Sequence, residues 1–85
     1  MTTKEYLKIV EEEIKNYDDF FDLDLEVIQV WYCKTIQNHK GLFILKVEDE
    51  ILPYFIEATY NGDRNELYLD FYTKKAKQII FCKNI

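Results

Sequence analysis

The feature that most constrains the fold is a change of hydrophobic period near residues 22–24. Upstream, apolar residues recur at steps of three and four, as on one face of a helix. They are Tyr6, Leu7, Val10, Ile14, Tyr17 and Phe21, with Ile9 and Phe20 widening the stripe. Downstream of the acidic link DLD the period becomes two, and β-branched and aromatic residues are frequent, which is typical of strands. One helix followed by strands in 85 residues predicts a single α+β domain.

The start of the helix is marked by Thr2 and Glu5, which fit a capping box. The apolar stripe then predicts a helix over residues 3–21 that lays this face on a sheet. The acidic face of the helix has two open interpretations: a solvated surface, or a mimic of nucleic acid that occupies a basic groove on another protein.

Four strands are predicted, over residues 25–34, 41–48, 53–60 and 66–72. Pro53 is expected at the first position of the third strand, where a missing N–H donor is tolerated. Asn61-Gly62 predicts a tight hairpin, because both residues tolerate positive φ. The last segment is expected to begin as a turn or short helix and to end as a strand through Ile79–Cys82. The fold expected is therefore an N-terminal helix on one face of a four- to five-stranded antiparallel sheet, with a meander as the simplest order.

The charge distribution argues against direct binding of nucleic acid. The net charge is −5, and nine of the sixteen acidic residues lie in residues 1–26, against three lysines. Binders of nucleic acid normally carry a basic stripe. A basic partner protein is compatible with this charge.

The chain shows no N-terminal apolar stretch of the kind found in a signal peptide or a membrane-spanning helix. Its two cysteines, Cys33 and Cys82, are fewer than a secreted domain of this size usually carries. We therefore expect a cytoplasmic protein with reduced thiols.

Several kinds of chemistry lack their residues. The chain has no serine, no CxxC or HxxxH spacing and no glycine-rich phosphate loop. We therefore expect no enzyme, no cofactor and no metal site. Cys33 and His39 form the only neighbouring cysteine–histidine pair, and an enzyme using them stays an alternative. Their simpler interpretation is a small strand residue and a surface histidine. Glu57 and Asp70 are expected on a solvated sheet face rather than as a catalytic pair.

Binding is the better-supported interpretation of residues 30–41, VWYCKTIQNHKG, which read as a strand that breaks into a polar loop. If the first strand buries Ile28 and Val30, then Trp31 points away from the helix, beside aromatics of the last hairpin. Exposed aromatic clusters mark interfaces. The residues expected to bind a partner are Trp31, Lys34, Gln37, Asn38, His39, Lys40, Tyr68, Asp70 and Tyr72. A second copy of the chain, an unrelated protein and a small molecule such as a nucleotide all remain open as the bound species.

Two stretches, WYCKTIQNHKGL (31–42) and ATYNGDRNELYLDFYTK (58–74), resemble an uncharacterised family of small proteins from phages and prophages of Gram-positive bacteria. The shared pattern is WxCKTxQNxK followed by TYNGDxxELYLDxY. Because the family is a domain of unknown function, the resemblance implies context rather than activity: a phage protein made inside a bacterial cell. Such proteins often bind and disable a host defence system, including CRISPR, or redirect a host enzyme. We therefore expect a phage accessory protein that acts by binding a host protein.

Overall fold

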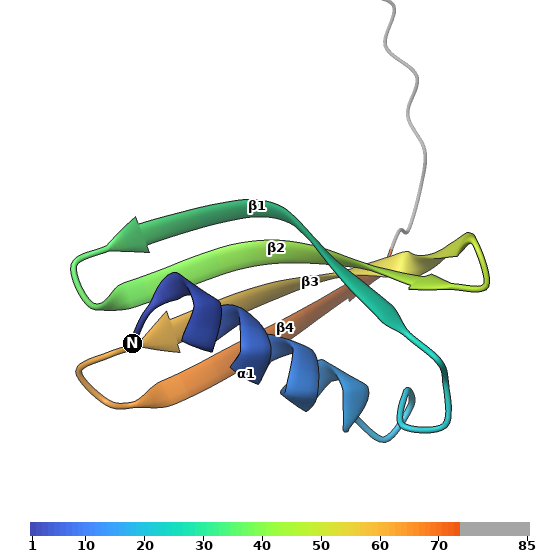
Figure 1. Ribbon diagram of the computed structural model, residues 1–85, viewed down its shortest axis with the longest axis horizontal. Helices are drawn as coiled ribbons and strands as arrows, with labels where there is room; N and C mark the ends of the chain where they lie inside the picture. Colours follow the sequence, from blue (N-terminus) through green and yellow to red (C-terminus); the bar gives the residue numbers. More distant parts are fainter. Residues whose placement is uncertain (74–85) are drawn as a thin grey trace, which may run out of the picture.

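The computed structural model describes residues 1–73 and confirms the α+β fold. Its elements are α1 (Thr3–Lys15), β1 (Glu26–Thr35), β2 (Asn38–Val47), β3 (Glu50–Asn61) and β4 (Glu66–Thr73). The strands form one antiparallel sheet in the order β1-β2-β3-β4, a meander with α1 crossing in front of it (Figure 1). The strand predicted at Ile79–Cys82 lies outside the described residues.

The core forms where α1 lies on the sheet. Tyr6, Val10 and Ile14, spaced by four residues on one helix face, are buried against apolar side chains of the central strands. The strand residues of this core are Phe43, Leu45, Ile56 and Ala58. The predicted capping box is present: the Thr2 hydroxyl accepts a hydrogen bond from the Glu5 N–H, and the Glu5 carboxylate accepts one from the Thr2 N–H.

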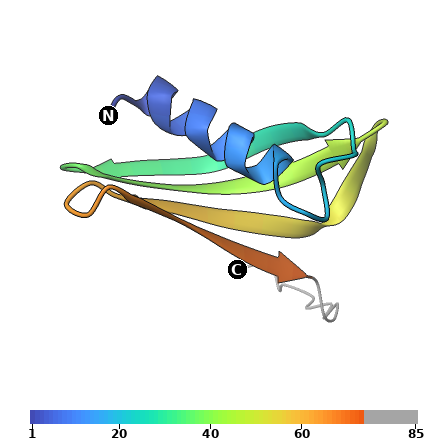
Figure 2. The ribbon, with the colours of Figure 1, turned by 90° about the horizontal axis from the view of Figure 1, so that it is seen from below.

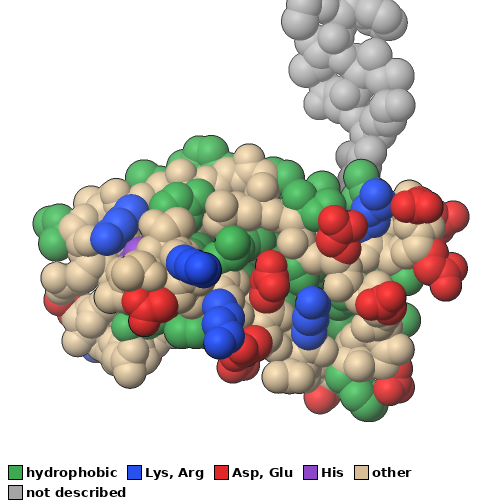
Figure 3. Space-filling model, in the orientation of Figure 1, with side chains coloured by type: hydrophobic (Ala, Val, Ile, Leu, Met, Phe, Trp, Pro, Cys, Tyr) green, Lys and Arg blue, Asp and Glu red, His purple; other side chains and the backbone are tan. Residues whose placement is uncertain are grey.

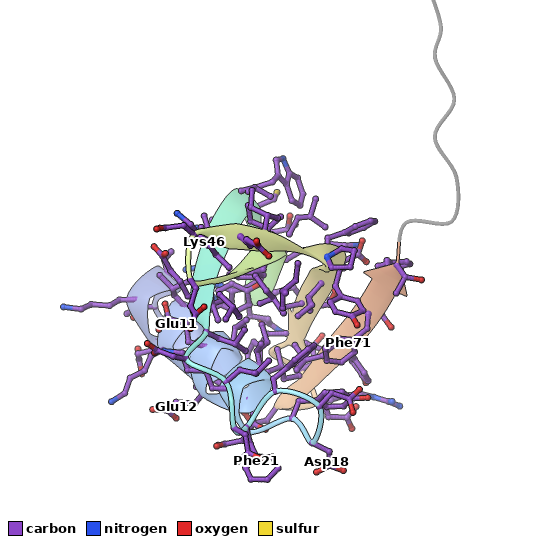
Figure 4. All side chains as sticks on the ribbon, turned by 90° about the vertical axis from the view of Figure 1, so that its right-hand side faces the viewer. Glu11, Glu12, Asp18, Phe21, Lys46 and Phe71 are labelled. Carbon is purple, nitrogen blue, oxygen red and sulfur yellow. The ribbon has the colours of Figure 1, made fainter. Side chains whose placement is uncertain are left out.

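The helix is shorter than predicted, and this changes which phenylalanine enters the core. After Asn16 the chain continues in three-residue steps, with the Phe20 N–H donating to the Tyr17 carbonyl at 2.8 Å. Asn and Asp side chains compete for backbone hydrogen bonds, so NYDD is a poor helix former. Phe20 is consequently buried, whereas Phe21 is 64% exposed and points away from the sheet beside Asp18 (Figure 4). The assignment of Phe21 to the core stripe is wrong because it assumed that the helical period continues.

The β3–β4 hairpin has the predicted register. Ile56 pairs with Phe71, Ala58 with Leu69 and Tyr60 with Leu67, so both apolar sets face α1. Pro53, in contrast, is the fourth residue of β3 rather than its first. It falls in the irregular stretch of register between β2 and β3, where it has no register partner on β2, so the missing N–H of proline is tolerated.

A bulge in β1 changes the expected facing of that strand. The register with β2 shifts between Gln29 and Trp31, leaving Val30 as an extra residue. Val27 before the bulge and Tyr32 after it therefore share the core face, whereas Ile28 and Val30, which were expected there, do not pack on the core. Trp31 still points away from the helix, as predicted, because the extra residue Val30 shifts the alternation of side chains by one position after Gln29.

Candidate functional site

The candidate site is the sheet face opposite α1, which we call the open face. Figure 2 shows the helix on one side of the sheet only, and no element within residues 1–73 covers the other side. Register places three rows of side chains on this face, each running from β1 to β4. The rows are Ile28–Ile44–Phe55–Tyr72, Trp31–Leu42–Glu57–Asp70, and Cys33–Lys40–Thr59–Tyr68.

Large aromatic side chains are half exposed on the open face. Trp31 is 52% exposed, and Tyr68 and Tyr72 are each 42% exposed. The ring of Tyr72 stacks on Phe55, with centroids 5.0 Å apart and planes at 15°. A sheet face that meets only water normally carries polar residues. This aromatic surface is instead typical of a protein interface.

The charges on the open face are not balanced among the described residues. The Lys40 ammonium lies 3.2 Å from the Glu57 carboxylate. Glu57 also lies directly opposite Asp70 on β4, so two carboxylates are cross-strand neighbours. Like charges in this position repel. Within residues 1–73, Asp70 has no ion-pair partner, so the aromatic surface carries an excess negative charge at its β3–β4 side.

A shallow hollow of about 280 Å³ lies on the same face beside Trp31. Its wall includes Cys33, Thr35, Lys40 and Thr59. Its volume lies just below the range of about 300–1,000 Å³ that is common for small-molecule sites. The hollow therefore suits one side chain of a partner better than a whole ligand.

The polar loop predicted at residues 35–40 is in fact a two-residue turn, Ile36-Gln37, because β2 begins at Asn38. Its polar residues have structural partners in the β3–β4 loop. The Gln37 side-chain amide donates to the Asp63 carboxylate, and the Asn38 side-chain oxygen accepts a hydrogen bond from the Gly62 N–H at 3.0 Å. Gln37 and Asn38 therefore bind the two hairpins together, rather than standing free for a partner.

Gly62 is required at this junction for a reason that differs from the predicted one. No glycine in residues 1–73 has positive φ; the left-handed residue of this loop is Asn65, at φ 52°. A Cβ at position 62 would lie 2.4 Å from the Gln37 carbonyl oxygen. Gly62 therefore allows a close approach of two backbones.

His39 is not a surface residue, as the sequence suggested, but is 1% exposed under the start of α1. Its ring stacks on Tyr6 with centroids 5.1 Å apart, and its Nδ1 lies 2.6 Å from the Tyr32 hydroxyl. Burial, together with the positive charge of Lys34, holds the pKa of His39 below its ordinary value of 6.5. His39 is therefore a neutral residue of the core and is not available to a partner.

Cys33 and His39 project to opposite faces of the sheet. Cys33 pairs with Lys40 on the open face, whereas His39 is buried on the helix side, with Lys34 as its register partner. Neighbouring residues of a strand point to opposite faces of the sheet. His39 is the neighbour of Lys40, which pairs with Cys33, so the Cys33 and His39 side chains do not meet. Lys34 likewise belongs to the helix side. Neither Lys34 nor His39 is part of the open face, contrary to the expectation that they line the site.

Comparison with protein-family models finds a match to a family of unknown function, DUF6275, over residues 2–82. The chain belongs to the DUF6275 family. No curated protein and no solved structure matches this DUF6275 protein.

Five of the nine predicted binding residues of this DUF6275 protein share the open face: Trp31, Lys40, Tyr68, Asp70 and Tyr72. The prediction omitted Leu42 and Ile44 between them, whereas Phe55 was expected among the aromatics of this face. A signal for Leu42 and Ile44 was present in the sequence, because residues 42–45 are apolar without alternation. Such a run is typical of a strand covered on both faces.

The helix side of the DUF6275 protein differs in character from the open face. Figure 3 shows this side, with acidic and basic side chains interspersed and acids gathered towards the end of the molecule where the β2–β3 hairpin lies. Residues 1–73 contain no group of three or more His, Cys, Asp or Glu side chains placed to hold a metal ion. Within the same range, no helix has the length and apolar character needed to cross a membrane.

Proposed function

We propose that this protein acts by binding another protein through its open face. The observation that carries this proposal is the sheet surface that no element of residues 1–73 covers and on which Trp31, Phe55 and Tyr72 are 40–52% exposed. Aromatic residues of this kind supply most of the binding energy at protein interfaces, because they bury much area with little loss of side-chain entropy. Leu42 and Ile44 lie between them and extend the apolar centre.

The cellular context comes from the sequence motifs, which resemble those of small phage and prophage proteins. We propose that the chain is a phage accessory protein located in the host cytoplasm, and that its partner is a bacterial protein, such as a component of a defence system. A homodimer through the same face stays a prediction, although each copy would bring its own Glu57–Asp70 pair into the interface. That charge favours a different partner.

A second candidate function is supported by the hollow beside Trp31. An indole ring next to Lys40 offers a stacking surface and a positive charge, which are the elements of a nucleotide site. The ion pair of Lys40 with Glu57 and the small volume count against it. A nucleotide that binds there should raise the melting temperature of the wild-type protein but not that of Trp31→Ala.

The first experiment is affinity capture from bacterial host lysate with the tagged chain. Three baits are compared: wild type, Trp31→Ala/Tyr72→Ala, and Phe21→Ala as the matched control. Phe21 is also an exposed aromatic, but it lies on the α1–β1 link, away from the open face. We expect one host protein to be captured by wild type and Phe21→Ala and to be lost with the double variant. Capture that is equal for all three baits, or absent for wild type, contradicts the proposal.

A further inference from the structure

The open face combines exposed aromatic rings with an unbalanced pair of carboxylates. Glu57 and Asp70 are register partners on β3 and β4, and only Glu57 has a basic neighbour among the described residues. On β4, Asp70 stands between Tyr68 and Tyr72, each two residues away on the same face. A cation placed over Asp70 would therefore have a tyrosine on either side along the strand, and a cation near an aromatic ring gains cation–π attraction in addition to the ionic contact.

We infer that the partner presents an arginine side chain to Glu57 and Asp70, which rests on the protein-binding function proposed above. A guanidinium group is planar, donates in a fork that matches carboxylate oxygens, and stacks on aromatic rings. Lysine carries the same charge, but its ammonium group has neither the planar fork of donors nor a flat surface that stacks on aromatic rings. The partner segment is thus a basic stretch of protein whose apolar neighbours cover Trp31 and Phe55.

Charge over the whole described region agrees with this partner. The chain carries a net charge of −5, and residues 1–73 hold all sixteen acidic residues but only seven of the eleven basic ones. Such a body attracts a basic partner at long range and repels a second copy of itself. The net negative charge and the carboxylate pair on the open face therefore favour the same class of partner, a basic one.

The probe for the test is a library of random twelve-residue peptides, selected on the full-length protein. Binding of the enriched peptides is followed by the fluorescence anisotropy of a dye on the peptide, so that variants lacking Trp31, the only tryptophan, are measured in the same way. Each arginine of an enriched peptide is then replaced by citrulline, which keeps the shape and removes the charge.

Three variants make the test specific. Glu57→Gln/Asp70→Asn removes the carboxylates, and Glu12→Gln/Glu13→Gln makes the same change of net charge on exposed positions of α1. We expect the first to weaken arginine peptides by about tenfold or more, and the second by less than about twofold. Lys40→Gln frees Glu57 from its ion pair, so it should strengthen binding several-fold. Circular dichroism checks that each variant is folded.

The outcomes separate the two proposals. One outcome is that the enriched peptides need Trp31 and Tyr72 but still bind after replacement of arginine by citrulline, and another is that they contain no basic residue. Either result overturns the arginine contact but leaves the open face as a binding site. No enrichment, or enrichment that survives Trp31→Ala/Tyr72→Ala, overturns both. Sedimentation that shows a dimer dissociated by Trp31→Ala identifies a second copy as the occupant and overturns the basic partner.

Discussion

The Tyr32 hydroxyl lies 2.6 Å from Nδ1 of His39, and both groups are enclosed between the first turn of α1 and the β1–β2 hairpin. The Thr3 hydroxyl lies 3.1 Å from the same Tyr32 oxygen, which joins the helix to this contact. Gly41 makes the enclosure possible, because a Cβ at that position would lie 2.8 Å from the Tyr6 hydroxyl. A polar network thus fixes the end of α1 on the sheet.

The free energy of unfolding should fall as pH drops below about 6.5. Burial holds the pKa of His39 lower in the folded chain than in the unfolded chain, so the unfolded chain takes up a proton first. The contribution of His39 is complete above pH 6.5 and is lost as pH falls, by at most about 1.4 kcal/mol per pH unit. Urea unfolding between pH 7.5 and 5.5 measures this. His39→Gln should have a flatter profile, and parallel profiles would refute the assignment.

Two adjacent phenylalanines should differ strongly in their effect on stability. Phe20 is 5% exposed and packs on Tyr54, whereas Phe21 is 64% exposed. Phe20→Ala should lower the free energy of unfolding by about 3–5 kcal/mol, and Phe21→Ala by less than about 0.5 kcal/mol. Chemical denaturation of the two variants is a direct comparison. Equal losses would mean that the helix continues beyond Asn16.

Ile36 carries strain at the β1–β2 turn. It has φ 56° and a side chain that is 85% exposed, an unusual conformation for a β-branched residue with little packing to offset it. Ile36→Gly should stabilise the protein by about 1 kcal/mol, since the relieved strain exceeds the entropic cost of glycine. Thermal unfolding measures the change, with Ile51→Gly as an exposed strand control that should destabilise. A loss of stability in Ile36→Gly would show that its side chain has a packing role.

The carboxylate pair on the open face should reduce stability in the absence of a partner. Asp70→Asn removes the repulsion with Glu57 and should raise the free energy of unfolding by about 0.2–1 kcal/mol. The gain should shrink at 1 M salt, where screening is strong. Asp18→Asn, on the exposed α1–β1 link, is the matched control and should have a smaller effect. A destabilising Asp70→Asn would indicate that Asp70 has a favourable contact within the chain.

The sequence by itself determined the elements and most of their facing. The capping box, the four-residue spacing of Tyr6, Val10 and Ile14, and the alternation in the β3–β4 hairpin are local patterns, and each appears in the structure as predicted. Such patterns are readable because the periods of a helix and a strand are properties of the backbone alone. The meander follows from short connections between consecutive strands.

The tertiary structure alone decided which polar residues lie on the open face. His39 lies in a stretch that reads as a polar loop, yet it is buried, because β2 starts at Asn38 and the space beside Gly41 and Tyr6 accepts its ring. The bulge at Val30 places Ile28 and Trp31 on the same face, which simple alternation along the strand would not do. One inserted residue changes every later side chain from one face to the other. Turn length and bulges depend on contacts between strands, so local sequence patterns do not specify them.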